Sequence, residues 1–170
     1  MNLPERFEAL IITLSDRAYR GEYQDLSGPS VKGKLSEFFA LQKWDYSIRT
    51  VLIPDDAGML QDKIREARER TDFIFTTGGT GIGPHDITVD AIRPLLTIEI
   101  PGIMEFIRIK YGSENPNALL SRGIAGITGK SLIYTLPGSV RAVDEYMTEI
   151  LKTLKHAVLM QHGIDSHGKH

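Results

Sequence analysis

The segment from Thr76 to Asp86 constrains this chain most, because four of the six residues from 78 to 83 are glycine. This glycine loop, residues 78–83, follows a short apolar run at 72–75 that predicts a buried strand. Glycine has no Cβ atom to keep the backbone away from a ligand, and successive N–H groups can surround an anion. Asp86 follows just before a helical pattern. The segment therefore indicates a site for a phosphorylated ligand and a metal ion.

Apolar runs that predict strands alternate with periodic runs that predict helices. Strands are expected at 9–14, 46–53, 73–76 and 132–136. Helices are expected at 30–40 with Ser30 as N-cap, 59–70, 89–96 with Thr88 as N-cap, 103–110 and 139–157. This alternation predicts an α/β fold, a three-layer sandwich with a mainly parallel central sheet flanked by helices. We expect one domain over residues 1–163 and a flexible tail at 164–170.

Polar segments follow four of the predicted strands, and in a parallel sheet they would share one rim. Ligands bind in such sheets beyond the carboxyl ends of the strands. The four segments are Ser15-Asp16-Arg17, Pro54-Asp55-Asp56, the glycine loop with Asp86, and Pro137-Gly138-Ser139.

The composition excludes several classes of protein. The 170 residues include no cysteine, which excludes disulfides and thiolate metal sites and fits a reducing cytoplasm. The formal net charge is −2 and basic residues alternate with acids, so we expect no nucleic-acid partner. No apolar run approaches the ~20 residues that span a bilayer, so we expect no membrane contact.

Two nucleotide-binding patterns fail on inspection. Residues 126–131 end like a phosphate-binding P-loop, but position 124 is isoleucine and a strand follows where a helix is required. This segment is interpreted as a turn. The dinucleotide pattern G-x-G-x-x-G fails because Pro84 takes the place of its third glycine. Neither a P-loop nucleotidase nor a Rossmann dehydrogenase is supported.

Each candidate residue also has a purely structural interpretation. The glycine loop would serve as a tight connection, and Asp86 as the cap of the following helix. Asp55 belongs to a Pro-Asp pair that is common in turns. Arg17 and Arg122 would form surface ion pairs, or would offer a planar fork to a phosphate. Residues 137–139 would cap the last helix, or bind an anion through their N–H groups. The residues alone leave these alternatives open.

Taken together, the segments resemble the molybdopterin adenylyltransferase family of molybdenum-cofactor biosynthesis, in its stand-alone bacterial form. The resemblance covers about residues 8–163, and its order and spacing are highly specific. The matching pieces are Leu14-Ser15-Asp16-Arg17-Ala18, Tyr23-Gln24-Asp25, Ile53-Pro54-Asp55-Asp56, Thr76-Thr77-Gly78-Gly79-Thr80-Gly81 with Asp86-Ile87-Thr88, Pro101-Gly102, Leu120-Ser121-Arg122 and Leu136-Pro137-Gly138-Ser139.

The resemblance implies an ATP- and Mg²⁺-dependent nucleotidyltransferase that adenylylates molybdopterin and releases pyrophosphate. It further implies a cytoplasmic homotrimer and a molybdenum-insertion protein as a partner. Asp55 and Asp86 would be the catalytic pair that positions Mg²⁺. The residues that would line the pterin and nucleotide pockets are Ser15, Asp16, Arg17, Thr77, Gly78, Gly79, Thr80, Gly81, Ser121, Arg122, Pro137, Gly138 and Ser139. His85 is given no role.

One position departs from the family pattern, and two other functions compete. Val89 stands where the family often has proline, which weakens the helix start and leaves the chemistry intact. The first competitor is a non-catalytic molybdopterin-binding carrier or scaffold, which would lose parts of the acidic and arginine set. Retention of Asp16, Arg17, Asp55 and Asp86 argues against it. The second competitor, an unrelated phosphate-binding module, requires the ordered motifs to be coincidental.

Overall fold

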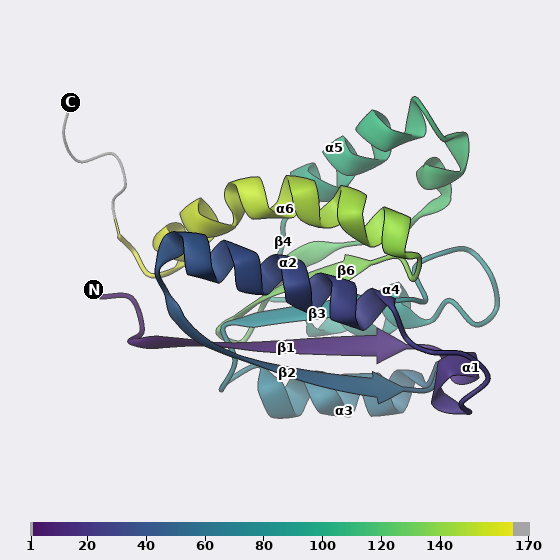
Figure 1. Ribbon diagram of the computed structural model, residues 1–170, viewed down its shortest axis with the longest axis horizontal. Helices are drawn as coiled ribbons and strands as arrows, with labels where there is room; N and C mark the ends of the chain where they lie inside the picture. Colours follow the sequence, from purple (N-terminus) through teal and green to yellow (C-terminus); the bar gives the residue numbers. More distant parts are fainter. Residues whose placement is uncertain (1, 165–170) are drawn as a thin grey trace.

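A computed structural model describes residues 2–164 and contains one six-stranded sheet in the order β2-β1-β3-β6-β5-β4 (Figure 1). Strands β1, β2, β3 and β6 are parallel, whereas β4 and β5 are antiparallel to their neighbours. The strands are β1 Arg6–Leu14, β2 Asp45–Ile53, β3 Phe73–Thr77, β4 Ile98–Glu99, β5 Ala125–Thr128 and β6 Ser131–Leu136.

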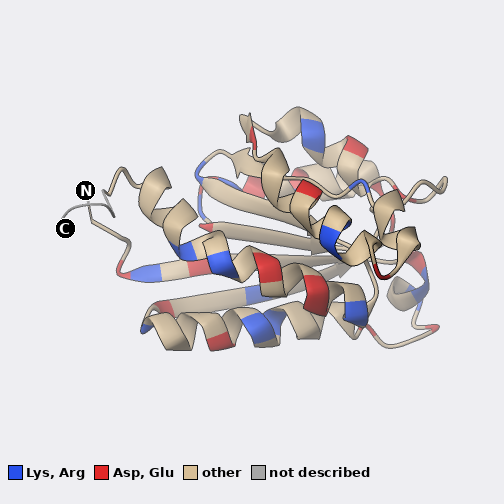
Figure 2. Cartoon of the chain, turned by 90° about the horizontal axis from the view of Figure 1, so that it is seen from above, with Lys and Arg blue, Asp and Glu red and all other residues tan. Residues whose placement is uncertain are grey.

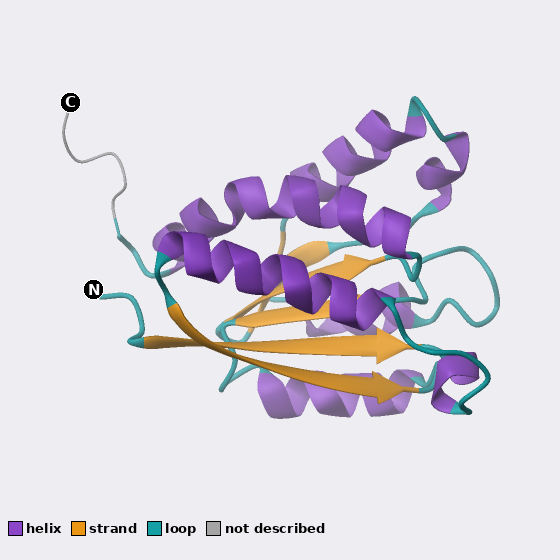
Figure 3. Ribbon diagram, in the orientation of Figure 1, coloured by secondary structure: helices purple, strands orange, loops and turns teal. Residues whose placement is uncertain are grey.

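Helices cover both faces of the sheet and complete three layers (Figure 3). The helices are α1 Asp16–Tyr19, α2 Ser27–Gln42, α3 Ala57–Ala67, α4 Thr88–Ile92, α5 Pro101–Gly112 and α6 Val140–Gln161. Two 3₁₀ helices, η1 Arg93–Leu95 and η2 Pro116–Leu120, lie between them. The predicted three-layer α/β fold is therefore confirmed. The described segment, residues 2–164, contains no helix that is long and apolar enough to cross a membrane.

The core divides into two clusters because successive strand residues point to opposite faces of the sheet. On β1, Phe7, Ala9 and Ile11 pack toward α2 and α6. Leu10 and Ile12 pack in the second cluster, against α3 and α4. Burial on both faces explains why the central strands read as continuous apolar runs. Acidic and basic residues are interspersed along the helices in Figure 2, with no large region of a single sign.

The carboxyl ends of β1, β2, β3 and β6 lie at one edge of the sheet, which we call the rim (Figure 1). From β1 the chain passes through α2 to β2, and then through α3 to β3 on the other side of β1. The order of connection thus reverses between β1 and β3, and ligands bind at such a switch point in open α/β sheets. All four predicted polar segments begin at this rim.

Two predicted helix caps are wrong. Helix α2 begins at Ser27, three residues before the proposed cap Ser30, because the Asp25 carboxylate accepts hydrogen bonds from the Gly28 N–H and the Ser27 hydroxyl. Helix α4 begins at Thr88 itself, and the Thr88 hydroxyl donates to the Gly78 carbonyl instead of capping. That helix ends at Ile92 and gives way to η1 near Pro94, because proline cannot continue an α-helical hydrogen-bond ladder.

Residues 126–131 form a hairpin and no phosphate loop. They span the end of β5, a turn at Gly129 with φ of 56°, and the start of β6. This confirms the interpretation as a turn. The two short antiparallel strands, β4 and β5, were not predicted. Strand β4 has only two residues, too few to show an alternating pattern.

One charged side chain is buried between α5 and α6. Glu149 is 5% exposed and accepts hydrogen bonds from Lys110 Nζ at 2.6 Å, Lys152 Nζ at 2.7 Å and Tyr111 Oη at 3.1 Å. Burial alone would raise the pKa of the Glu149 carboxyl, but these donors outweigh it and lower that pKa to about 2. The network therefore fastens α5 to α6 as long as the carboxylate is ionised.

Glu149→Gln is expected to lower the free energy of unfolding by about 1–2 kcal/mol at pH 7, because it removes the charge that both lysines bind. The loss stays this small because the two ammonium groups are partly exposed and water can solvate them. Since the folded pKa lies below the unfolded one, the contribution is present above about pH 4.5 and is lost as the pH falls toward 2. Urea unfolding at pH 7 and pH 3 measures this, with the exposed Glu66→Gln as control. An equal loss at both pH values would contradict the prediction.

Candidate functional site

A cavity of about 320 Å³ opens at the rim between the glycine loop and the start of α6. Its lining includes the predicted residues Gly79, Thr80, Gly81, Asp86, Ser121, Pro137, Gly138 and Ser139. Five polar residues that the sequence did not single out also line it: Asn115, Asn117, Arg141, Glu145 and Tyr146. The structure thus brings together residues that are up to 67 positions apart in the chain, from Gly79 to Tyr146.

The glycine loop leaves β3 in a conformation that only glycine tolerates. Gly78 has φ of 102°, and a Cβ atom there would lie 2.3 Å from the Leu14 carbonyl oxygen. Gly79 has φ of 67°, and a Cβ there would lie 2.4 Å from the Thr88 hydroxyl. Between residues 2 and 164, no group accepts a hydrogen bond from the N–H of Gly79, Thr80 or Gly81. These donors are free for an anion.

Two contacts join the ends of β3 and β6 behind the glycine loop. The Thr77 hydroxyl donates to the Pro137 carbonyl at 2.8 Å, and the Gly78 N–H donates to the Leu136 carbonyl at 2.9 Å. Thr77 is fully buried and does not line the cavity. It holds the glycine loop beside residues 137–139 and does not face a ligand directly.

Asp86 does not cap α4, so the capping interpretation is wrong. The N-cap is Ile87, without a side-chain capping bond. Instead, Asp86 Oδ2 accepts a hydrogen bond from the Gly83 N–H at 2.8 Å. Its second oxygen, Oδ1, has no partner within the described part of the chain. The carboxylate is thus oriented through one oxygen and offers the other at the edge of the cavity.

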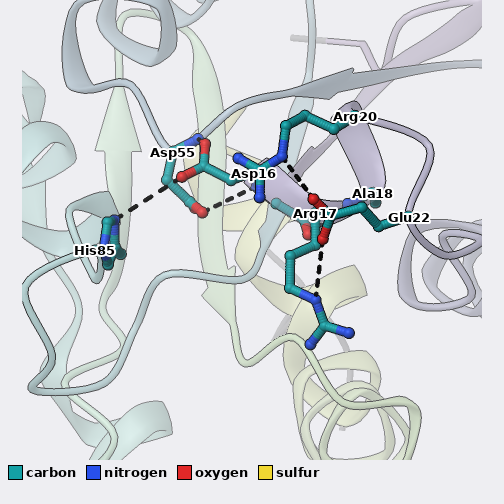
Figure 4. Close-up of polar contacts among 8 residues, drawn as sticks. Asp16, Arg17, Ala18, Arg20, Glu22, Asp55 and His85 are labelled. Carbon is teal, nitrogen blue, oxygen red and sulfur yellow. Dashed lines mark hydrogen bonds and ion pairs between the residues drawn. The ribbon is translucent and has the colours of Figure 1, made fainter.

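Asp55 is oriented in the same way at the end of β2 (Figure 4). Its Oδ2 accepts from the Asp16 N–H at 3.1 Å, and Asp16 Oδ1 accepts from the Asp55 N–H at 2.9 Å. Burial raises the pKa of the Asp55 carboxyl, and the negative charges of Asp16 and Asp86 raise it further, against the hydrogen bond from Asp16. His85 Nδ1 lies 3.9 Å from Asp16 Oδ2.

The carboxylates of Asp55 and Asp86 are oxygen ligands of the kind that a hard divalent cation such as Mg²⁺ takes. Asp55 and Asp86 each keep one oxygen free of protein hydrogen bonds within the described residues, and their charges repel each other. Residues 2–164 contain no group of three acidic or histidine side chains arranged to enclose a metal. Mg²⁺ usually takes only one or two protein carboxylates and fills its other positions with phosphate and water.

The segment after β1 lies outside the cavity. Ser15 caps α1 by accepting from the Ala18 N–H, and its hydroxyl lies 2.9 Å from the Tyr23 hydroxyl. The Arg17 guanidinium stacks over the Tyr23 ring at 5.1 Å, and its Nε lies 3.6 Å from Glu22. Arg17 therefore has the surface ion pair of its structural interpretation. Its side chain is 70% exposed and extends toward Glu22, away from Asp55 (Figure 4).

Ser121 and Arg122 are neighbours that face different ways. Ser121 lines the cavity, where its hydroxyl lies 2.9 Å from that of Tyr146. Arg122 does not line the cavity, because its guanidinium is bonded to the glycine loop and to Asp90. The sequence treated the two as a single ligand-facing pair, and the structure separates them.

Residues 137–139 cap the last helix, as one of their two interpretations predicted. Ser139 is the N-cap of α6, and its hydroxyl oxygen accepts from the Ala142 N–H at 3.2 Å. The N–H groups of Gly138 and Ser139 have no acceptor within residues 2–164 and lie at the cavity wall. The N-terminus of the 22-residue helix α6, where the helix dipole is positive, thus lies at the same cavity as the glycine loop.

The five unpredicted residues could be found only in part from the sequence. Tyr146 was placed on the apolar stripe of the last helix, and burial does raise the pKa of its hydroxyl. Arg141 and Glu145 form an exposed i,i+4 pair of the kind that usually marks a solvated helix face. Asn115 and Asn117 lie in a connection with no periodic pattern. Only the three-dimensional positions of η2 and of the first turns of α6 beside the loop assign these residues to the cavity.

Comparison with known proteins agrees with this arrangement. Residues 10–156 match the model of a family described as probable molybdopterin binding domain. A molybdopterin adenylyltransferase of Pyrococcus furiosus is 34% identical over 91% of this chain and 93% of its own. The crystal structure of the molybdopterin biosynthesis enzyme MoaB of Thermus thermophilus is 36% identical, covers 92% of this chain and 97% of that one, and superposes with a TM-score of 0.80.

Longer relatives contain the same domain. The molybdenum cofactor synthesis protein cinnamon of Drosophila melanogaster is 37% identical over 87% of this chain, which spans only 24% of the length of that protein. The resemblance inferred from the ordered motifs is confirmed. The chain belongs to the molybdopterin-binding domain family that includes the molybdopterin adenylyltransferases and the MoaB proteins.

Proposed function

We propose that this protein adenylylates molybdopterin with Mg-ATP, giving adenylylated molybdopterin and pyrophosphate, as a step of molybdenum-cofactor biosynthesis. The observation that carries the proposal is the cavity wall at the rim. There, three successive N–H groups without protein acceptors stand beside Asp86, whose carboxylate keeps one oxygen free. Membership of the family and the relatives named molybdopterin adenylyltransferase support the choice of substrate and reaction.

The two sides of Asp86 would hold the two substrates. On one side is the cavity formed by the glycine loop, Ser121 and residues 137–139, with N–H donors for phosphate and hydroxyls for a polar heterocycle. On the other side is the partly exposed polar group of Ser15, Asp16, Arg17 and Asp55. Polar segments on either side of two oriented carboxylates would bring two anionic reactants together, which is most of what phosphoryl-group transfer requires.

The reaction needs no nucleophile from the protein, because the terminal phosphate of molybdopterin attacks the α-phosphorus of ATP and pyrophosphate leaves. Asp55 and Asp86 would hold Mg²⁺, whose charge offsets that of the phosphates when it is bound. The backbone N–H groups of residues 79–81 orient phosphate oxygens and stabilise the charge that develops on them. The absence of cysteine is compatible with this chemistry.

The proposal extends to assembly and location. We infer a homotrimer in the cytoplasm that passes its product to a molybdenum-insertion protein. Sedimentation equilibrium of the purified protein tests the trimer directly, since a mass near three times that of one chain is expected.

The function is tested by incubating purified protein with molybdopterin, ATP and Mg²⁺ and measuring adenylylated molybdopterin and pyrophosphate. Formation of both products, abolished by a chelator, is the expected result. Tight molybdopterin binding without product would instead favour the non-catalytic carrier. Binding of neither molybdopterin nor ATP would overturn the proposal altogether.

A further inference from the structure

Arg122 binds the glycine loop and Asp86 at three backbone carbonyls. Its own N–H donates to the Thr80 carbonyl at 2.8 Å, its Nε to the Gly81 carbonyl at 2.8 Å, and its Nη2 to the Asp86 carbonyl at 2.9 Å. Its Nη1 lies 3.1 and 3.0 Å from the two carboxylate oxygens of Asp90. One residue, 36 positions after Asp86, thus bonds to both ends of the segment from the loop to Asp86.

These bonds determine where the loop N–H groups point. In a trans peptide unit the C=O of one residue and the N–H of the next point in opposite directions. Since Arg122 holds the carbonyls of Thr80 and Gly81, the N–H groups of Gly81 and Ile82 are directed away from it. Thr88 holds the carbonyls of Gly78 and Gly79 in the same way, through its hydroxyl at 2.8 Å and its N–H at 3.1 Å.

The contacts also explain why this position holds an arginine. The guanidinium is planar and presents its N–H donors in a fixed fork, so it can bond two carbonyls and a carboxylate at once. A lysine ammonium would keep the charge but could not reproduce that set. The Arg122 side chain is 35% exposed, and Asp90 orients it from the solvent side with a carboxylate that is 68% exposed.

We propose that Arg122 is a positioning residue for adenylyl transfer. It holds the second half of the glycine loop, so that the Gly81 N–H faces the ligand, and it holds Asp86 at the edge of the cavity, without contacting either substrate. The inference rests on the proposed function for its effect on turnover, whereas its effect on the loop can be measured without any substrate. This role differs from the one expected from the sequence, in which the Arg122 guanidinium would bind a phosphate of the substrate.

The test compares Arg122→Lys and Arg122→Gln with Asp90→Asn and with the control Arg65→Gln, which removes an exposed ion pair on α3. Steady-state adenylylation gives kcat and KM, and ¹⁵N relaxation of the ligand-free protein gives order parameters for the N–H groups of Gly81 and Ile82, which the Arg122 contacts direct. We expect kcat to fall by about tenfold or more in both Arg122 variants alike. The loop order parameters should fall from about 0.85 to below about 0.6, while those of β3 stay unchanged. Asp90→Asn should lower kcat by only about two- to threefold.

Three results would overturn the proposal. If Arg122→Lys kept a nearly normal kcat while Arg122→Gln lost it, the charge would be acting on a substrate directly. Unchanged order parameters at Gly81 and Ile82 would show that Arg122 does not hold the loop. An equal loss of order in β3 would show general destabilisation. If the unmodified protein formed no product, the proposed function would be wrong, and the order parameters would still decide whether Arg122 positions the loop.

Discussion

Asp86→Asn is expected to lower kcat for adenylylation by about a hundredfold or more, while molybdopterin binding stays within a few-fold of its original strength. Asparagine has the same size and can still accept the Gly83 N–H, so the loop keeps its shape. It loses the negative charge that would help to hold Mg²⁺ on the triphosphate. The rate of product formation and equilibrium binding of molybdopterin measure the two effects separately.

The acidic pair after β2 supplies matched variants for this experiment. Asp55→Asn should reduce kcat steeply, as Asp86→Asn does, because Asp55 also keeps one carboxylate oxygen free among the described residues. Asp56→Asn should leave kcat unchanged. Asp56 is the N-cap of α3 and accepts the Met59 N–H at 2.7 Å, and asparagine caps helices equally well. Nearly normal turnover in Asp86→Asn, with only a lower melting temperature, would show that Asp86 has a structural role alone.

Gly78→Ala is expected to lower the free energy of unfolding by about 3 kcal/mol, which corresponds to a fall in Tm of roughly 10 °C. The substitution combines two costs. The backbone at Gly78 has φ of 102°, which alanine adopts poorly, and the new methyl group would lie 2.3 Å from the Leu14 carbonyl oxygen. Since β1 and β3 are paired strands in the centre of the sheet, little movement can relieve that contact. Thermal and urea unfolding measure the loss.

Gly21→Ala is the matched control for backbone strain without a clash. Gly21 has φ of 77°, and nothing lies within 4 Å of a Cβ built there. Its replacement should cost only about 1 kcal/mol. The difference between the two variants then isolates the contact with Leu14. Equal losses in both would show that β1 and β3 separate easily at the rim, contrary to the packing seen here.

The positions of the main site segments were predictable because they depend on local pattern and one rule of topology. Alternating elements imply parallel strands, and parallel strands place Asp16, Asp55 and Asp86 at a common rim. The strand order and the two short antiparallel strands were beyond prediction. They are determined by pairing between distant segments, and β4 is too short to carry a pattern.

The roles of single side chains were less predictable than their positions. A helix-capping Asp86 and a metal-binding Asp86 would occupy the same place just before a helix. Only the bond from the Gly83 N–H, seen in the structure, argues against the capping role. Arg122 follows Ser121 directly, and adjacent residues in an extended segment point opposite ways. The sequence showed the pair but not which member faced the cavity.

The free N–H groups of residues 79–81 are main-chain atoms. The site therefore has one wall whose chemistry does not depend on side chains and another wall whose chemistry does. Substitutions in the loop would weaken the proposed phosphate binding but would not redirect it, since every residue type except proline carries the same N–H. Selection among phosphate esters must therefore come from the opposite wall, where Asn115, Glu145 and Tyr146 present side chains. Altered substrate preference, in nature or in the laboratory, should arise along α6 and η2 while the glycines stay fixed.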